Sequence, residues 1–242
     1  MAMEIVGVDG CKAGWISFTM NEAGLTLKCF PTFIEVIKAY SSQSNFLVDI
    51  PIGLPFSIME SEQRPEAMAR QYLKKKASSI FNVPCAQAAE QKTYDATNRM
   101  NKLVLHKGLS KQSFYLIKKI QEVNTFLLEN KSYIHKVFEC HPELAFTRLT
   151  LDKVALASSK KTLAGQLERL DLLAEVSDRF GQYREKIEAT ELFQKYPDDC
   201  IDACCIAIVG MLGQAKGLTT IPEEPSKNRD GMPMQMVFFD RS

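Results

Sequence analysis

Acidic side chains stand at the ends of several buried segments of the chain. Burying a carboxylate costs several kcal/mol unless the group is paired or bound to a metal, so each of these acids needs a partner. The acids are Asp9 after the apolar run Ile5–Val8, Asp49 after Phe46–Val48, Glu139 within the strand-like stretch 136–143, and Asp199 and Asp202 on one face of a predicted helix over 198–210. Carboxylates from separate elements can hold two divalent cations roughly 4 Å apart for phosphodiester hydrolysis. Oxygen ligands suit Mg²⁺ or Mn²⁺ better than zinc.

Each acid also has a purely structural interpretation. Asp9 precedes Gly10, and Asp-Gly is a common hairpin turn. Asp49 could be part of the scaffold if an explicit partner neutralises it. Acids such as Asp198 and Asp199 are favoured at a helix N-terminus, where Asp198 can serve as the cap. Asp202 lies deeper in the predicted helix, and its carboxylate is harder to explain in that way.

The spacing of apolar residues predicts the elements that position these acids. Three antiparallel strands, the third at Gly24–Phe30, are followed by a short helix over 32–40 and by a buried strand that ends near Asp49. The stretch 136–143 would place Glu139 and His141 on one strand face. Helix 198–210 is apolar nearly all round and must be buried. We therefore expect an α/β fold with a mixed sheet flanked by helices.

Helical patterns fill the remainder of the chain. We expect a helical insertion at about 57–131, with Ser110 as the N-cap of one of its helices. A helix from Lys160 to about Ile187 is expected to be interrupted at Gly181. We expect one domain over residues 1–242, and a C-terminal extension at about 217–242 that contains a possible edge strand at 235–239.

Composition narrows the class of protein. A net charge of +1 argues against a general basic surface that coats nucleic acid, although the insertion carries much of the positive charge. Arg70 and its neighbouring lysines could contact phosphates or simply form a solvated face. The seven cysteines are scattered, and Cys200 and Cys204 fit buried small hydrophobes better than a metal site. No apolar run approaches the length of a membrane span, so we expect a cytoplasmic protein without a membrane partner.

Several motifs resemble those of one family. They are Val8-Asp9-Gly10-Cys11-Lys12-Ala13-Gly14-Trp15, Asp49-Ile50-Pro51-Ile52-Gly53-Leu54-Pro55, Glu139-Cys140-His141-Pro142-Glu143 and Asp202-Ala203, together with Arg64, Arg70, Ser78-Ser79, Phe81 with Pro84, and Lys160-Lys161-Thr162. The chain resembles domain-of-unknown-function family 429 (DUF429), predicted ribonuclease H-like nucleases, over roughly residues 5–215. It departs from the family at Glu66, where we expect aspartate, and at Asn124, where an acid is common.

The resemblance implies a ribonuclease H-like fold and a metal-dependent nuclease acting on nucleic acid. The metal ligands would be Asp9, Asp49, Glu139, Asp199 and Asp202, with Mg²⁺ or Mn²⁺ as cofactor and with all of these except Asp199 as catalytic residues. Substrate contacts would come from Lys12, Arg64, Arg70, His141 and Lys161. Two alternatives stay open on the same fold: a non-catalytic module that binds nucleic acid or nucleotides, and a phosphotransfer protein.

Overall fold

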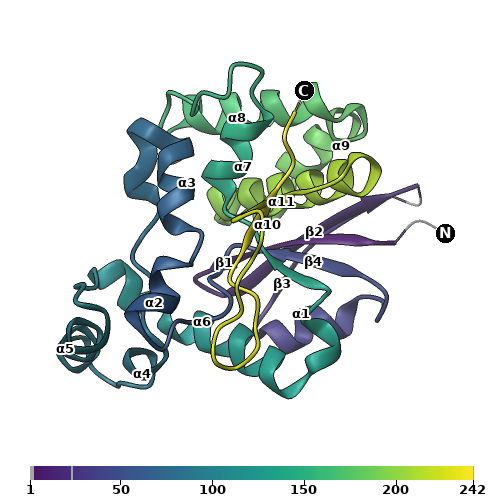
Figure 1. Ribbon diagram of the computed structural model, residues 1–242. Helices are drawn as coiled ribbons and strands as arrows, with labels where there is room; N and C mark the ends of the chain where they lie inside the picture. The colour runs from purple at the N-terminus through teal and green to yellow at the C-terminus, as the bar shows by residue number, and fades with distance from the viewer. Residues whose placement is uncertain (1–2, 23, 242) are drawn as a thin grey trace. The chain divides into compact units, whose positions relative to one another are not determined.

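A computed structural model describes residues 3–22 and 24–241 of the chain (Figure 1). The chain divides into two units, which are described separately. Unit 1 comprises residues 1–49, 136–219 and 237–242, and unit 2 comprises residues 50–135 and 220–236. The predicted helical insertion lies within unit 2. The strands β6 (Thr219–Ile221) and β7 (Met236–Phe238) mark where the chain passes between the units, and β7 confirms the strand predicted near 235–239.

Unit 1 is built on a five-stranded sheet with the order β3-β2-β1-β4-β5. β1, β2 and β3 pair antiparallel, whereas β4 runs parallel to both β1 and β5. The strands are β1 (Ile5–Cys11), β2 (Gly14–Asn21), β3 (Gly24–Phe30), β4 (Asn45–Val48) and β5 (Val137–Glu139). This mixed sheet with helices packed against it confirms the predicted α/β fold, and its strand order is consistent with a ribonuclease H-like fold.

Six helices belong to unit 1 within the described residues. They are α1 (Phe33–Ala39), α7 (Pro142–Leu149), α8 (Leu163–Val176), α9 (Asp178–Glu188), α10 (Glu191–Lys195) and α11 (Pro197–Lys216). α1 begins with a capping box in which Thr32 and Glu35 satisfy each other's backbone amides, as suits a short helix with few internal hydrogen bonds.

α11 packs directly on the sheet because glycines let the two backbones approach closely (Figure 1). A Cβ atom on Gly7 of β1 would lie 2.1 Å from the Ala203 carbonyl oxygen of α11. A Cβ atom on Gly210 would lie 2.5 Å from Ile5 Cγ2. These contacts fix which face of β1 meets the helix, and the all-round burial of α11 confirms the sequence prediction.

Three local predictions in unit 1 are wrong. The helix predicted from Lys160 breaks at Ser177, which caps α9, whereas Gly181 lies inside α9. Asp198 does not cap α11; the helix begins after Tyr196, and the Asp198 carboxylate accepts a hydrogen bond from Gln166 Nε2 at 3.0 Å. β5 ends at Glu139, so His141 is not on the strand.

Unit 2 is mainly helical. Its elements are α2 (Ile58–Glu62), α3 (Glu66–Leu73), α4 (Ala86–Ala89), α5 (Tyr94–Leu105), α6 (Lys111–Glu129) and the 3-10 helices η1 (Lys74–Ser79) and η2 (Lys131–Tyr133). Ser110 caps α6 as predicted, since its hydroxyl accepts from the Ser113 amide at 3.0 Å. Within the described residues of the whole chain, no helix has the length and apolarity needed to cross a membrane.

Asn124 explains one departure from the family pattern. Its amide nitrogen donates to the Pro51 and Ile120 carbonyls, both at 2.8 Å, and its amide oxygen accepts from the Gly53 backbone at 2.9 Å. A carboxylate could accept from Gly53 but could not donate to the two carbonyls. Asn124 therefore holds the start of unit 2 in a way that an acid would not.

Candidate functional site

Asp9 lies on the face of β1 that meets α11. Side chains alternate along a strand, so Asp9 shares the face of Gly7 and Ile5, which both contact α11. Asp9 pairs with Ile16 of β2 inside the hairpin, and the tight turn comes later, between Cys11 and Gly14. The Asp-Gly pair is therefore part of the strand, and Asp9 is buried against the helix.

Asp49 stands beside Asp9 at the same edge of the sheet. It follows β4 directly, and its amide donates to the Val8 carbonyl at 3.0 Å, which extends the parallel pairing of β1 and β4 by one residue. Leu47, two residues earlier, contacts the Gly210 position of α11. Alternation along the strand therefore places Asp49 on the α11 side of the sheet, as it does Asp9.

Asp202 comes to these two acids from α11. Its side chain is almost completely buried, and one carboxylate oxygen, Oδ2, accepts from Lys160 Nζ at 2.5 Å. The other oxygen, Oδ1, is buried without a hydrogen-bond partner in the described part of the chain. An unpartnered buried carboxylate oxygen is costly, so it marks a position where a further positive or donor group is missing.

The three carboxylates perturb one another. Burial raises the pKa of Asp9 well above 3.8, and the charges of Asp49 and Asp202 raise it further. Burial raises the pKa of Asp49 to about 6, against the opposing charge of Lys160. The pKa of Asp202 is also raised, chiefly by burial. The raised pKa values mean that burial and the neighbouring acids together disfavour the charged form of each carboxylate, and that Lys160 offsets only part of this effect.

Lys160 supplies the positive charge that the cluster does have. Burial by itself would lower the pKa of Lys160, but the charges of Asp202, Asp9 and Asp49 raise it above its usual value. The side chain is therefore an ammonium ion at neutral pH. Sequence reasoning selected the neighbouring Lys161, which is exposed, as the residue of interest.

The segment before α8 is built to present Lys160. A Cβ atom on Gly165 would lie 1.9 Å from the Ser159 carbonyl oxygen, so the start of the helix lies tightly against this segment. The Thr162 side chain caps α8 and donates to the same carbonyl at 2.8 Å. The carboxylate of Glu168 accepts from the Ala157 amide at 3.2 Å and from the Ser158 amide at 3.0 Å. These contacts hold the backbone on both sides of Lys160 and thereby fix its position.

Glu143 is a second residue that sequence reasoning left out of the site. Its charge raises the pKa of both Asp49 and Asp202, so it lies within electrostatic range of the cluster. Its carboxylate pairs with the fully buried Arg169 of α8 at 2.5 Å. Glu143 is part of the sequence motif Glu139–Glu143, but an acid in the first turn of a helix is favoured there in any case, so its residue type alone does not mark it as part of the site.

The other predicted site residues of unit 1 have different surroundings. Asp199 is close enough for its charge to raise the pKa of Asp9. Glu139 is buried, and its charge raises the pKa of the Cys140 thiol, after the larger effects of burial and of Asp49. The His141 ring caps α7, where Nδ1 accepts from the Leu144 amide at 3.4 Å. Lys12 is exposed in the hairpin turn.

Arg64 and Arg70 belong to unit 2 and are described with that unit. Arg64 is buried, and its guanidinium donates to Glu66 and to the Ile52 and Gly53 carbonyls. Arg70 donates to the Ile80 and Phe81 carbonyls and to Asn82. Their predicted contact with substrate stays a prediction.

The cysteines contribute no separate site. All seven lie in the described part of the chain and are free thiols. Cys200 and Cys204 are buried, and burial raises the pKa of both thiols, which disfavours the thiolate that a metal requires. This is the environment expected for small hydrophobic side chains.

The donor set fits a hard divalent cation, although the residues are not arranged around one. Among the described residues, no group of three or more His, Cys, Asp or Glu side chains is placed so that it could hold a metal ion. The converging donors are nevertheless all carboxylates, and Asp202 Oδ1 is a buried acceptor without a partner. Mg²⁺ and Mn²⁺ prefer this chemistry. In this structure Lys160 supplies the cluster's positive charge.

Comparison with known proteins identifies the family. The family described as "Protein of unknown function (DUF429)" matches residues 7–227. The chain belongs to this family. The matched region includes Asp9, Asp49, Glu143, Lys160 and Asp202, so the whole acid cluster lies within the DUF429 match. No curated protein and no solved structure matches the chain.

Proposed function

We propose that this DUF429 protein is a metal-dependent nuclease that hydrolyses phosphodiester bonds of nucleic acid. The observation that carries the proposal is the convergence of Asp9, Asp49 and Asp202 from β1, the end of β4 and α11, with raised pKa values and one unpartnered carboxylate oxygen. A purely structural acid is expected to be satisfied by its neighbours, whereas Asp202 keeps one buried carboxylate oxygen without a hydrogen-bond partner in the described part of the chain.

Asp9 and Asp202 would hold the cations, with Asp49 and Asp199 as further ligands. Glu139 is set apart from these acids, because the register pairs it with Val48 and so places its side chain on the opposite face of the sheet from Asp49. Bound Mg²⁺ or Mn²⁺ would activate a water molecule and stabilise the charge that develops on the leaving oxygen. The carboxylates must be ionised to act as ligands. Because the pKa of Asp49 is about 6, metal affinity is expected to fall as the pH drops through that value.

Lys160 has an electrostatic role in this proposal. Its raised pKa keeps it protonated, so it cannot accept a proton from water at neutral pH. It can neutralise the acids when no metal is bound and attract a phosphate when one is. Lys12, Lys161 and His141 in unit 1, and Arg70 in unit 2, remain the proposed direct substrate contacts, whereas Arg64 is buried in its ion pair with Glu66. The seven free thiols suit the reducing cytoplasm, which is the compartment that we propose.

One observation favours a second candidate function. Lys160 already forms a short ion pair with Asp202, and a protein that keeps this lysine permanently in the cluster needs no metal. Such a protein would be a non-catalytic module that binds nucleic acid or nucleotides on the same fold. The two proposals differ in whether a divalent cation stabilises the native state.

Thermal unfolding with and without millimolar Mn²⁺ separates these two proposals. A ligand that binds only the native state raises the melting temperature, by the equivalent of about 2.7 kcal/mol at a concentration of 100 times the dissociation constant. The nuclease proposal predicts a rise for the wild type and none for Asp9→Asn. Equal melting temperatures with Mn²⁺ and with EDTA would leave the non-catalytic module as the better account. Labelled single-stranded, duplex and junction oligonucleotides of DNA and RNA would then show which substrate is cleaved.

A further inference from the structure

The two units differ in net charge, although the whole chain is close to neutral. The sequence of unit 2 contains 15 lysines and arginines against 10 aspartates and glutamates, whereas the remainder of the chain contains 15 against 19. Unit 2 therefore carries a net charge of +5, and unit 1 carries −4. The positive charge of the chain is thus concentrated in unit 2, and positive charge is what attracts a polyanion.

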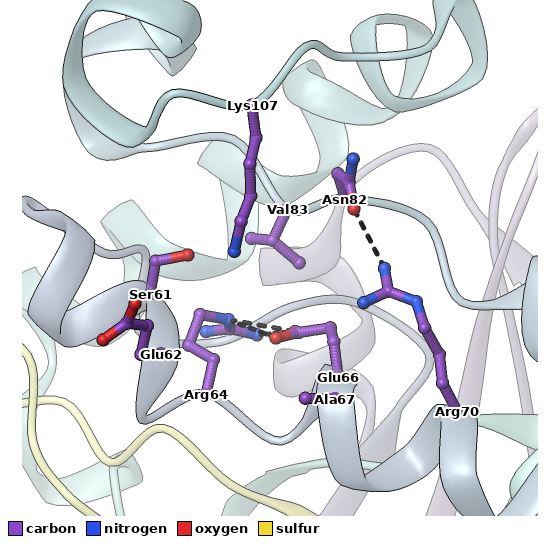
Figure 2. Close-up of a pocket in the computed structure, with 9 residues that line it drawn as sticks. All are labelled: Ser61, Glu62, Arg64, Glu66, Ala67, Arg70, Asn82, Val83 and Lys107. Carbon is purple, nitrogen blue, oxygen red and sulfur yellow. Dashed lines mark hydrogen bonds and ion pairs between the residues drawn. The ribbon is translucent and has the colours of Figure 1, made fainter.

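Unit 2 contains a polar pocket of about 160 Å³ (Figure 2). A cavity holds one water molecule when about 10–15 Å³ of its space is open to the centre of a water-sized sphere, so this larger pocket has room for a tetrahedral anion. Its lining residues come from three stretches of unit 2: Ser61, Glu62, Arg64, Glu66, Ala67 and Arg70 around α2 and α3, Asn82 and Val83 after η1, and Lys107 after α5.

The floor of this pocket is a fixed ion pair. Arg64 donates to both carboxylate oxygens of Glu66, at 2.9 and 3.1 Å from Nε, and to the Ile52 and Gly53 carbonyls at 2.7 Å. Its side chain is 1 % exposed. The pair satisfies its own charge and holds the pocket in shape, so recognition of an anion falls to the residues above it.

Three donors in the pocket have no hydrogen-bond partner among the described residues. Arg70 is held by Asn82 and by the Ile80 and Phe81 carbonyls through Nε and Nη2, which leaves Nη1 without a partner in residues 3–22 and 24–241. Figure 2 shows that nitrogen and the Lys107 ammonium pointing into the pocket, with the Ser61 hydroxyl facing the Lys107 side chain. No described residue bonds the Lys107 ammonium or the Ser61 hydroxyl either. Glu62 is the one acid at the rim, and its carboxylate points outward in the same view.

A second pocket of about 480 Å³ shares Arg70 and Asn82 with the first. Its lining includes the half-buried ring of Phe81 and the hydroxyl groups of Ser78 and Ser110. Lysines flank this lining in the sequence: Lys74–Lys76 precede Ala77, and Lys111 lies between Ser110 and Gln112. An aromatic ring beside basic residues is the arrangement that proteins use to stack a base while holding the backbone phosphates.

We propose that the two pockets form one groove of unit 2 that binds single-stranded nucleic acid. One phosphate lies between Arg70 Nη1, Lys107 Nζ and the Ser61 hydroxyl, and an adjacent base stacks on Phe81. A duplex does not fit, because its bases are paired and cannot reach the ring. The assignment of the polyanion as nucleic acid rests on the proposed function, and it names single strands as the substrate class.

Fluorescence anisotropy of the full chain in EDTA tests the groove without any cleavage. The probes are a labelled single-stranded 20-mer, the duplex of the same sequence, and the unlabelled mononucleotide as competitor. We expect the single strand to bind more tightly than the duplex. Lys107→Ala should reduce the slope of log affinity against log salt by about 0.7, the value for one phosphate contact on a single strand. Phe81→Leu, which keeps an apolar side chain, should weaken binding roughly 5-fold or more.

Lys92→Ala is the matched control, since Lys92 is an exposed lysine of unit 2 outside both pockets. This substitution should leave the affinity for the single strand within roughly twofold of wild type, because an exposed charge outside the binding groove contributes little. Equal effects of Lys92→Ala and Lys107→Ala, equal or tighter binding of the duplex, or full competition by the mononucleotide at the same affinity would each overturn the proposal. So would the absence of oligonucleotide binding. If the protein binds single strands through these residues but its melting temperature does not respond to Mn²⁺, the groove proposal stands and the nuclease proposal fails.

Discussion

Replacing Lys160 with methionine should expose how much the acid cluster depends on one ammonium group. Methionine keeps most of the length and the apolar stem of the side chain and removes the ammonium group with its hydrogen bond to Asp202. In the variant, the carboxylates of Asp9, Asp49 and Asp202 would remain in one cluster without their counter-ion. Since each of these carboxylates already has a raised pKa, the charged cluster should destabilise the native state.

The size of the effect follows from burial. Breaking a fully buried ion pair costs about 3–5 kcal/mol. Asp202 is 2 % exposed in its side chain but Lys160 is 36 % exposed, so solvent screens part of the interaction. We therefore expect a loss of about 1–3 kcal/mol at pH 8. For a chain of this size the corresponding fall in melting temperature is roughly 3 to 9 °C.

The loss should depend on pH with a defined sign. A carboxyl group whose pKa is raised in the folded state binds protons more tightly when folded, so stability is highest at low pH and falls as the pH rises through the folded pKa. Lys160→Met should therefore resemble wild type near pH 4.5 and diverge from it above about pH 6, the pKa of Asp49 in the wild type. Mn²⁺ should recover more stability in the variant than in wild type.

Thermal melts at several pH values measure this directly, with Lys161→Met as the control. Lys161 is the exposed neighbour in the same segment, and its substitution should change the melting temperature by little. The reasoning is refuted if the two variants melt together, or if the loss in Lys160→Met is the same at pH 4.5 and pH 8.

Two further predictions concern the residues that form and position the cluster. In wild type, ionising Asp49 in the folded protein costs about 3 kcal/mol of stability, because its pKa rises from 3.8 in the unfolded chain to about 6 in the folded one. Asp49→Asn should remove this cost, so the variant should become more stable relative to wild type as the pH rises from 4 to 7. A difference in unfolding free energy that stays constant over this pH range in denaturant titrations would contradict this. Gly7→Ala should destabilise the protein by about 3 kcal/mol or more, because the new Cβ would meet the α11 backbone. Gly181→Ala in α9 has space for the new Cβ and should stabilise the protein by about 0.5–1 kcal/mol. Urea unfolding that ranked the two variants in the opposite order would be incompatible with the packing described.

The period of two in β1 made the placement of Asp9 predictable. Ile5, Gly7 and Asp9 had to share a face, and the apolar helix near the C-terminus needed a surface to cover. The pattern does not show which segment of the chain packs against this face of β1. The contact between Gly7 and Ala203 joins residues far apart in sequence, and only the structure shows that it places Asp202 near Asp9.

Lys160 and Glu143 could not be chosen from the sequence for different reasons. Lys160 lies in an irregular segment, where no periodicity says which of two adjacent lysines points inward; Gly165 and the capping residue Thr162 decide it. Glu143 lies in the first turn of α7, where an acid is favoured by the helix dipole in any case, so its type gives no signal of a second role.

The wrong helix boundary shows competition between two local signals. Gly181 was expected to interrupt the helix because glycine is a poor helix former. Ser177 ends α8 and caps α9, since its side chain accepts a hydrogen bond from the Phe180 amide. A favourable cap stabilises a helix start by about 1 kcal/mol, which is comparable with the cost of one glycine inside a helix.

Cleavage of labelled oligonucleotides in Mn²⁺ by wild type, Asp202→Asn and Asp198→Asn tests the proposed nuclease site most directly. Both aspartates lie near the start of α11, but Asp202 faces the cluster whereas Asp198 accepts a hydrogen bond from Gln166. We predict that wild type and Asp198→Asn cleave with similar rates, and that Asp202→Asn folds with equal or greater stability in EDTA and cleaves nothing. Cleavage by Asp202→Asn at the wild-type rate would contradict the proposed site, and no cleavage by any of the three proteins would contradict the proposed function.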